Sequence, residues 1–183
     1  MTHVNPILNQ NAFRGRVDSG NEATPTWIAL ANTDWSQNVD EDFRVRFVIQ
    51  ETANSTNPAT VDPLIEYSLN SGAYAAVTAS TPIQFGTFTG ATDDDATTQQ
   101  LGAGTFVTGR LDSNGTVTTA DIQNSETEYE YCLFIDSAQV ANNDTIDLRV
   151  YDGATALDQY GVTPRITVVE ATPTTFTITT SLN

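Results

Sequence analysis

The chain has 183 residues, enough for one domain with a self-sufficient core, and a formal net charge of −16 from 23 acidic and seven basic side chains. All seven basic residues are Arg. Phosphate backbones and anionic membranes repel such a polyanion, so nucleic-acid binding and membrane binding are disfavoured. Apolar residues make up 39% of the chain and threonine is abundant, which is typical of a thin, strand-rich protein with large polar faces.

The cellular compartment follows from the cysteine count and from the start of the chain. The single cysteine, Cys132, excludes an intrachain disulfide. Residues 1–10 contain neither the basic segment nor the apolar run of a signal peptide, and no stretch of about 18 apolar residues is present to span a bilayer. We therefore expect a soluble protein that is made in a cytoplasm and is not secreted.

Taken in order, the chain begins with a polar segment and continues with many short strands. Residues 1–25 contain Gly and Pro and show no sustained period, which predicts an N-terminal arm. The sandwich domain is predicted at 26–170, and residues 171–183 are predicted as a C-terminal extra strand or arm. The predicted strands are 26–31, 43–51, 64–69, 74–79, 82–89, 105–111, 116–122, 127–136, 146–151, 157–160, 165–170 and 174–181.

Two local signals are the clearest in the chain. In residues 43–50, apolar side chains alternate with mostly polar or charged ones, which predicts a strand with one buried face. Asn114-Gly115, between the predicted strands 105–111 and 116–122, is the strongest short hairpin signal. Residues 90–104 form the longest stretch without a period, and we expect an irregular loop there.

The strand at 127–136 is predicted to be the centre of the fold. It contains no Gly or Pro, and Tyr129, Tyr131 and Leu133 recur on one face, while Glu128 and Glu130 take the opposite face, which we expect to be solvated. No segment of 10–12 residues has helical periodicity. The sequence therefore predicts an all-β fold, an antiparallel β-sandwich of the Ig-like or jelly-roll-like kind with extended N- and C-terminal arms.

The hydrophobic pattern also predicts a strand pairing. If the strands 127–136 and 146–151 are neighbours and bury their apolar residues on one face, Arg149 lies opposite Glu128 or Glu130 on the outer face. Such an exposed ion pair contributes about 0.2–1 kcal/mol.

The residues needed for catalysis are scarce, and no catalytic residue is predicted. The only histidine, His3, lies in the predicted arm, and the chain has no Lys, which disfavours nucleophilic triads and Schiff-base chemistry. Cys132 is expected to be a small buried hydrophobe. Glu128 and Glu130 lie about 6.5–7 Å apart by strand rise, which overlaps the spacing of inverting glycosidases. A flat strand face is not a cleft, however, and we expect a protein that is not an enzyme.

Two groups of residues are weaker candidates for ligand binding. Asp93, Asp94 and Asp95 could hold Ca²⁺ together with backbone carbonyls, although their spacing departs from an EF-hand and a mobile acidic loop is the alternative. No other metal and no cofactor is expected. Trp27 and Trp35 could form a platform for a sugar or another ligand, whereas packing in the core or at an interface is the more ordinary role of such residues.

Several segments between residues 26 and 170 resemble a β-sandwich domain of tailed bacteriophages and phage-derived proteins. The resemblance implies a structural or surface module of a virion with no catalytic residues, and it does not place the module on the particle. Residues 1–25 and 171–183 fall outside it. The matching segments are 43–52, 65–72, 95–101, 104–107, 127–131, 144–150 and 163–168.

From this resemblance and the acidity we expect an auxiliary protein that decorates the capsid exterior and is assembled into virions in the host cytoplasm. The alternative is a receptor- or glycan-binding module of a tail or fibre, and a carboxylate-dependent glycosidase is a distant third. The expected partners are further copies of the chain, as a homo-oligomer guessed to be a trimer, and virion proteins such as the major capsid protein. The apolar residues of the two arms are expected to form the interface: Ile7, Leu8, Phe13, Phe176 and Ile178.

Overall fold

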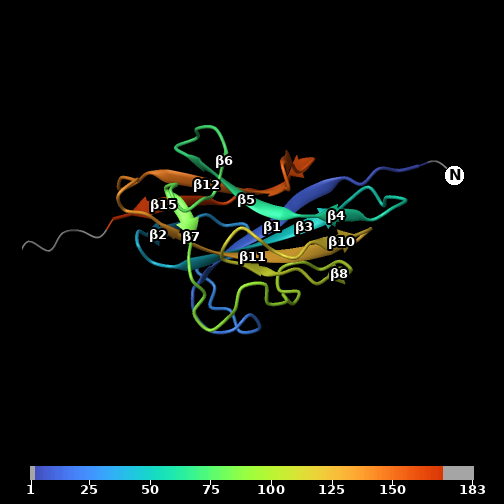
Figure 1. Ribbon diagram of the computed structural model, residues 1–183, viewed down its shortest axis with the longest axis horizontal. Helices are drawn as coiled ribbons and strands as arrows, with labels where there is room; N and C mark the ends of the chain where they lie inside the picture. The colour runs from blue at the N-terminus through green and yellow to red at the C-terminus, as the bar shows by residue number, and fades with distance from the viewer. Residues whose placement is uncertain (1–2, 171–183) are drawn as a thin grey trace, which may run out of the picture.

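Two stacked β-sheets account for most of the structure, a computed structural model that describes residues 3–170 (Figure 1). The all-β fold predicted from the sequence is confirmed, and none of the described residues belongs to a helix long and apolar enough to cross a membrane. The strands are β1 (Leu8–Val17), β2 (Trp35–Asn38), β3 (Phe43–Glu51), β4 (Ala59–Val61), β5 (Pro63–Leu69), β6 (Ala75–Ala76), β7 (Ile83–Phe85), β8 (Phe106–Val107), β9 (Leu111–Asp112), β10 (Ala120–Ile122), β11 (Glu126–Ile135), β12 (Thr145–Asp152), β13 (Thr155–Ala156), β14 (Gln159–Tyr160) and β15 (Arg165–Val169).

The larger sheet, sheet A, has the order β14-β1-β3-β11-β7, with β8 and β9 also paired to β11. Sheet B has the order β2-β15-β12-β5-β6, with β13 paired to β12, and β10 and β4 form a small third sheet. The long pairs are antiparallel, but β14 with β1, β2 with β15, and β8 and β9 with β11 are parallel. The architecture is therefore a sandwich of mixed rather than purely antiparallel sheets.

The hydrophobic core lies between sheets A and B. The apolar residues of β3 share the core face as predicted, since Phe43, Val45, Phe47 and Ile49 are all almost completely buried in it. The expectation of only one buried face is wrong, because Arg44, Arg46 and Val48 are buried on the other. The predicted central role of β11 is confirmed as well, because β3 pairs along its length and three further strands pair with it. The two tyrosines of β11 are buried with their hydroxyls donating to backbone carbonyls, as buried tyrosines usually require.

The prediction that residues 1–25 form an arm is wrong for β1. This strand lies inside sheet A between β3 and β14, and Leu8 and Phe13 belong to the core rather than to an interface with another subunit. Ile7 continues the pairing, because its carbonyl oxygen accepts a hydrogen bond from the amide of Thr52. The assignment of Leu8 and Phe13 to intersubunit contacts is therefore wrong, and that of the half-buried Ile7 stays a prediction.

A β-bulge explains why the sequence of β1 lacks the regular alternation that predicts a strand. The register of β1 against β3 shifts between Gln10 and Ala12, which breaks the period-two pattern of apolar residues. Gln10 is fully buried and hydrogen-bonds with its side chain to the carbonyl of Val162 and the amide of Val150. A buried amide satisfied in this way looks in the sequence like a solvent-exposed residue.

Three further local predictions are wrong. Residues 26–31 form no strand and contribute only an isolated bridge between Trp27 and Arg16. The Asn114-Gly115 hairpin does not form, because β9 pairs with β11 and β10 pairs with β4 instead. Arg149 does not meet Glu128 or Glu130, since β12 lies in sheet B between β15 and β5.

The remaining predicted strands of the sandwich are all found: β5 and β12 are one and two residues longer than predicted, and β6, β7, β14 and β15 are shorter. Residues 90–104 contain no strand, as expected. The predicted C-terminal strand, together with Phe176 and Ile178, lies outside the described residues.

The placement of β1 gives a direct test. Phe13→Ala should lower the free energy of unfolding by about 3–5 kcal/mol, because it opens a cavity in the core. Val17→Ala on the same strand should change it by less than about 0.5 kcal/mol, because Val17 is 44% exposed. Urea titration of both variants measures the difference, and equal, small effects would mean that β1 is a detachable arm after all.

Candidate functional site

The most unusual feature of the structure is a charged layer on the face of sheet A that points away from sheet B. It consists of Arg16 on β1, Arg44 and Arg46 on β3, and Glu128 and Glu130 on β11, all of which have no exposed surface. Charged side chains are almost never fully buried unless they are paired. The face predicted to be solvated is therefore sealed, and that prediction is wrong.

Glu130 is the centre of this charged layer. Its carboxylate accepts hydrogen bonds from Arg16 at 3.0 Å, from Arg46 at 2.8 Å and from Arg44 at 3.4 Å. The strand register brings these groups together, because Arg16 pairs with Arg44 across β1 and β3, and Arg46 pairs with Glu130 across β3 and β11. One carboxylate thus neutralises cations from two neighbouring strands.

Two segments, residues 18–24 and 86–104, cover the charged layer, and we call them the cap. Figure 1 shows these blue and green-to-yellow loops gathered beneath sheet A, on the side away from sheet B. Arg44 donates to the carboxylate of Asp18 at 2.6 Å and to the carbonyl of Thr89 at 2.8 Å. Arg46 donates to the carbonyl of Thr98 at 3.0 Å. The arginines therefore bind the cap as well as the sheet.

The carboxylates hold the cap from the opposite direction. Glu128 accepts the backbone N–H groups of three consecutive cap residues, Gln100, Leu101 and Gly102, at 2.8–3.0 Å. Glu22, from the other cap segment, lies 2.8 Å from Arg46. Glu128 and Glu22 thus connect both cap segments to the charged layer.

Burial and neighbouring charge act against each other on the arginines. Burial alone would lower the pKa of Arg46, but the carboxylates of Glu130, Glu22 and Glu128 outweigh it and raise that pKa. Burial dominates for Arg16 and lowers its pKa in spite of Glu130. Guanidinium groups stay protonated in proteins in either case, so the three arginines of the layer are cations.

This geometry leaves Glu128 and Glu130 unsuited to acid–base catalysis. Both carboxylates are occupied by arginines or backbone amides and are covered by the cap. A glycosidase pair would need a cleft for the sugar between the two carboxyl groups. The arrangement can hold loops in place, and it offers a substrate no route to either carboxylate.

Two other carboxylates, Asp152 and Asp158, line a cavity of about 380 Å³ near the start of β1. Burial raises the pKa of Asp152, the kind of shift that can mark a functional group. Each carboxylate, however, accepts a backbone N–H group, Asp152 from Asp62 at 2.7 Å and Asp158 from Leu8 at 2.8 Å. These contacts give both residues a role in joining loops.

The acidic triplet of the 90–104 loop also binds the protein itself. Asp93 accepts hydrogen bonds from the amide and hydroxyl of Ser113, and Asp94 accepts them from the amide and hydroxyl of Thr118. Asp95 accepts from an amide of its own loop. The three carboxylates thus face different partners, and among the described residues no group of three or more potential ligands is arranged around a metal position.

Another buried carboxyl, that of Asp112, lies on β9, the strand to which this loop is hydrogen-bonded. Its Oδ1 accepts the N–H groups of Asn114 and Gly115, and its Oδ2 has no partner among the described residues. Burial raises the pKa of Asp112. Its hydrogen bonds fix the 113–115 segment, which explains why the Asn114-Gly115 pair turns the chain here without forming a hairpin.

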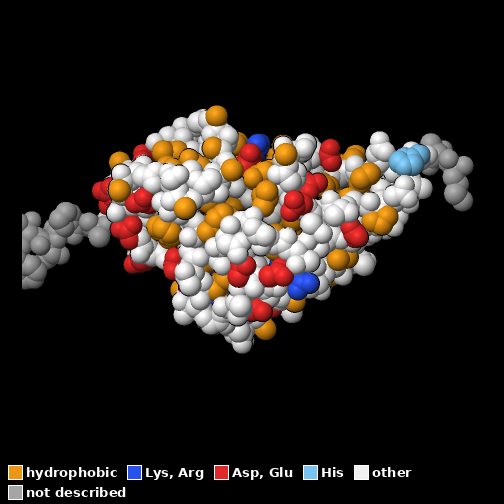
Figure 2. Space-filling model, in the orientation of Figure 1, with side chains coloured by type: hydrophobic (Ala, Val, Ile, Leu, Met, Phe, Trp, Pro, Cys, Tyr) orange, Lys and Arg blue, Asp and Glu red, His pale blue; other side chains and the backbone are white. Residues whose placement is uncertain are grey.

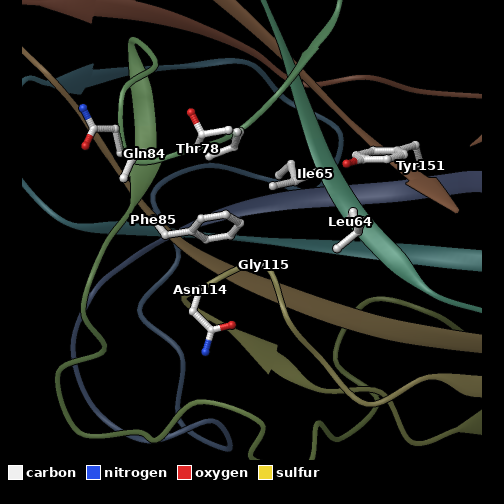
Figure 3. Close-up of a pocket in the computed structure, with 10 residues that line it drawn as sticks. Leu64, Ile65, Thr78, Gln84, Phe85, Asn114, Gly115 and Tyr151 are labelled. Carbon is white, nitrogen blue, oxygen red and sulfur yellow. The ribbon is translucent and has the colours of Figure 1, made fainter. Parts of the chain in front are cut away.

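An apolar cavity of about 430 Å³ opens between β5 and β7 (Figure 3). The ring of Phe85 points into it from β7, opposite Leu64 and Ile65 of β5, and Tyr151 lies beyond them. None of its lining residues is Asp, Glu, Lys or Arg: they are Leu64, Ile65, Val77, Thr78, Ala79, Gln84, Phe85, Asn114, Gly115 and Tyr151. We refer to this cavity as the β5–β7 pocket.

The outer face of sheet B, in contrast to that of sheet A, carries partly exposed polar and aromatic side chains. Arg149 pairs with Glu66 at 2.7 Å, and its guanidinium lies 4.0 Å from the ring centre of Tyr74 and 5.1 Å from that of Tyr160. An arginine held between two aromatic rings is a favourable cation–π arrangement. Arginine and tyrosine are also enriched at the energetic centres of protein interfaces.

The two tryptophans have different surroundings. Trp35 is buried in the core against Phe13 and Phe43, which excludes it from any surface platform. Trp27 is half-buried, and the guanidinium of Arg14 lies 4.6 Å from its ring centre. The structure does not bring the two rings together as one binding surface.

The remaining reactive side chains are placed as single groups. Cys132 is fully buried on β11, where burial raises the pKa of its thiol, in keeping with the predicted role as a small hydrophobe. His3 is exposed and lies 3.2 Å from the side-chain amide of Asn57. Neither residue lies in a group that resembles a catalytic triad.

Comparison with known proteins adds no family assignment: no protein-family model matches the chain, and no curated protein or solved structure gives a match.

Sequence reasoning missed the charged layer and the β5–β7 pocket. The layer had a signal, because Arg44 and Arg46 alternate on one predicted strand and Glu128 and Glu130 alternate on another. Opposite charges at matching spacing on two strands of one sheet indicate cross-strand pairing. The pocket had no such signal, because its lining comes from five separate stretches of the chain.

The charged layer predicts a large effect for loss of its central carboxylate. Glu130→Ala leaves three buried arginines without their common partner and should lower the free energy of unfolding by about 3–5 kcal/mol. Glu66→Ala breaks a partly exposed pair and serves as the matched control, with an expected cost of about 0.2–1 kcal/mol. Urea titration measures both, and similar costs for the two variants would contradict the central role of Glu130.

Asp112 and Asp136 predict opposite pH dependences. The pKa of Asp112 is raised, so the folded state binds more protons than the unfolded state and loses stability as pH rises through this pKa. Asp112→Asn should therefore stabilise the protein at neutral pH and lose this advantage in acid. The pKa of Asp136 is lowered, chiefly by Gln139, so Asp136→Asn should destabilise at neutral pH and become neutral in acid.

Thermal unfolding of the two variants and the wild type from pH 3 to pH 7 provides the measurement. The prediction for Asp112 fails if Asp112→Asn is less stable than the wild type at pH 7.

Proposed function

We propose that this chain is a structural protein of bacteriophage particles, an auxiliary protein that decorates the capsid exterior and stabilises the particle, with no catalytic role. The proposal takes its origin in the resemblance of segments between residues 43 and 168 to phage β-sandwich domains.

The observation that carries the proposal is how the protein uses its few cations. Three of the seven arginines are buried in the charged layer. Of the other four, Arg110, Arg149 and Arg165 each lie beside a carboxylate, and Arg14 lies over the ring of Trp27, so the described part of the chain offers few cations to a polyanion. Figure 2 shows carboxylates spread over one face with few blue side chains between them. Such a surface repels packaged nucleic acid and suits the outside of a particle.

The sealed face of sheet A supports a structural role. The cap is fixed by ion pairs and by hydrogen bonds to Glu128, so it is built to stay closed rather than to open over a substrate. Glu128 and Glu130, the carboxylates that the sequence makes the most plausible catalytic pair, bind the cap and the arginines instead. A rigid, well-sealed module is what a particle exposed to the environment requires.

We further propose that the protein acts as a homo-oligomer, guessed to be a trimer, bound to the major capsid protein. The high net charge makes complementary charge an unsuitable basis for self-association. Apolar and main-chain contacts must provide it, so association should strengthen with salt.

A second candidate function is receptor or glycan binding in a tail or fibre. It is favoured by the uncovered face of sheet B, where Tyr74, Arg149 and Tyr160 form a stacked group with the rings partly exposed. Sugars and protein receptors commonly contact such exposed aromatic rings. The two candidates differ in the number and the place of the copies on a particle.

Purified particles provide the test. Quantitative mass spectrometry should find the chain in a fixed stoichiometric ratio to the major capsid protein, and antibody labelling in the electron microscope should place it over the capsid. Particles stripped of the chain should lose heat stability and regain it when the folded protein is added. A few copies confined to the tail would favour the second candidate, and absence from particles would exclude both.

A further inference from the structure

The β5–β7 pocket adjoins an open strand edge of sheet A. On one side β7 pairs with β11, and among the described residues no strand pairs with its other side. Gly86, just after β7, donates its N–H group to the carbonyl of Cys132 on β11. Because hydrogen-bonding directions alternate along an antiparallel strand, the N–H groups of Ile83 and Phe85 point away from β11, toward the open side.

These main-chain groups call for a partner. Ile83 is completely buried, so its N–H group has no access to bulk water and needs an acceptor from a neighbouring segment. An added strand satisfies such groups, and a pocket beside the edge takes one of its side chains. The β5–β7 pocket, with the ring of Phe85 pointing into it, is placed to take such a side chain (Figure 3).

The pocket lining restricts the chemistry of the occupant. It contains no acidic or basic side chain, and its volume of about 430 Å³ exceeds the space that one large apolar side chain needs. An uncharged segment with strand-forming apolar residues is the matching occupant.

Residues 171–183 have this composition. They contain no charged side chain, and Phe176 and Ile178 alternate with threonines in the manner of a strand with one apolar face. The segment follows β15 and lies outside the described residues. Pro173, near its beginning, disfavours helix.

The end of β15 lies close to β7. The carbonyl of Val169 accepts a hydrogen bond from the amide of Val39 at 3.1 Å, and the next amide, that of Asp40, donates to the carbonyl of Ile135 at 2.8 Å. Ile135 in turn pairs with Ile83 of β7. Three steps between neighbouring backbones and one step along the chain give a path of roughly 20 Å from Val169 to Ile83.

The segment of the same chain is long enough for this path. An extended chain spans roughly 25 Å from Val169 to Phe176 and roughly 30 Å from Val169 to Ile178. Phe85 lies two residues beyond Ile83, or about 7 Å further along β7, so Phe176 reaches Ile83 and Ile178 reaches Phe85. A short tether also gives its own segment an effective concentration in the millimolar range, which favours the same chain over another copy in dilute solution.

We propose that residues 174–181 bind the open edge of β7 in the same chain as an added parallel strand, with Phe176 beside Ile83 and Ile178 inserted into the β5–β7 pocket beside Phe85. The segment covers an edge that could otherwise pair with other chains. It carries no charge, so this side of the molecule stays an uncharged place on an acidic surface. The inference goes beyond the proposed function, and its test on the purified protein is independent of any particle.

Disulfide cross-linking in the full chain locates the segment. Ala79, exposed at the pocket, and Ile178 are both changed to cysteine in one chain. The matched control combines Ile178→Cys with Ala138→Cys. Ala138 is exposed in the turn whose amide binds the carboxylate of Asp40, close to the end of β15, so an unattached segment links to it at least as readily as to the pocket.

Mild oxidation should join Ala79→Cys to Ile178→Cys within one chain, in several-fold higher yield than the control pair, with the mass of a monomer. The native Cys132 is fully buried and does not react. The proposal is overturned if the control links equally well, if no link forms at the pocket, or if the product has the mass of two chains, which would assign the pocket to another copy.

Hydrogen exchange gives a second, independent measurement. The N–H groups of Ile83 and Phe85 should be protected in the wild type, and Ile178→Asp should speed their exchange many-fold because it places a charge in the apolar pocket. Thr177→Asp adds the same charge on the opposite face of the strand and should retain the protection. Unchanged exchange of the β11 amides excludes a folding defect, and equal exchange at β7 in the two variants would contradict the proposal.

Discussion

The interaction on which the structure depends is the convergence of Arg16, Arg44 and Arg46 on Glu130. Burying charges costs several kcal/mol per ion, and ion pairs of this kind often do no better than apolar residues of the same size. Their main consequence is that they exclude other alignments of the strands. Any register of β1, β3 and β11 that separates the carboxylate from the arginines leaves bare charge in a dry environment, so the layer favours one alignment of three strands.

The same constraint positions the cap. A charged sheet face cannot be covered by an ordinary apolar loop, because the remaining donors of the arginines and the oxygens of Glu128 need partners. The cap provides backbone carbonyls, backbone N–H groups and the carboxylates of Asp18 and Glu22. Its small and polar residues follow from this task, which is to satisfy charge rather than to fill an apolar core.

How far the sequence predicts this molecule depends on which signals are local. The alternation of β3 and the composition of β11 are local, and both strands were predicted from them, as was the all-β fold. The strand β1 was not, because a bulge and the buried Gln10 interrupt its pattern. The Asn114-Gly115 pair locally favours a hairpin, but the hydrogen bonds of Asp112 and the pairing of β9 with β11 prevail over this local preference.

The placement of the arginines affects how copies of the protein can associate. Sheet A consumes three of the seven arginines internally, so few cations are left to offset the acidic surface that another copy must approach. Copies that carry such a surface repel one another more strongly at low salt, and contacts between them are confined to places without charge. The β5–β7 pocket, which has an uncharged lining, is such a place, and it adjoins an open strand edge. Because the buried arginines cannot offset the acidic surface, an uncharged place such as the β5–β7 pocket is better suited to contact with another copy than the rest of that surface.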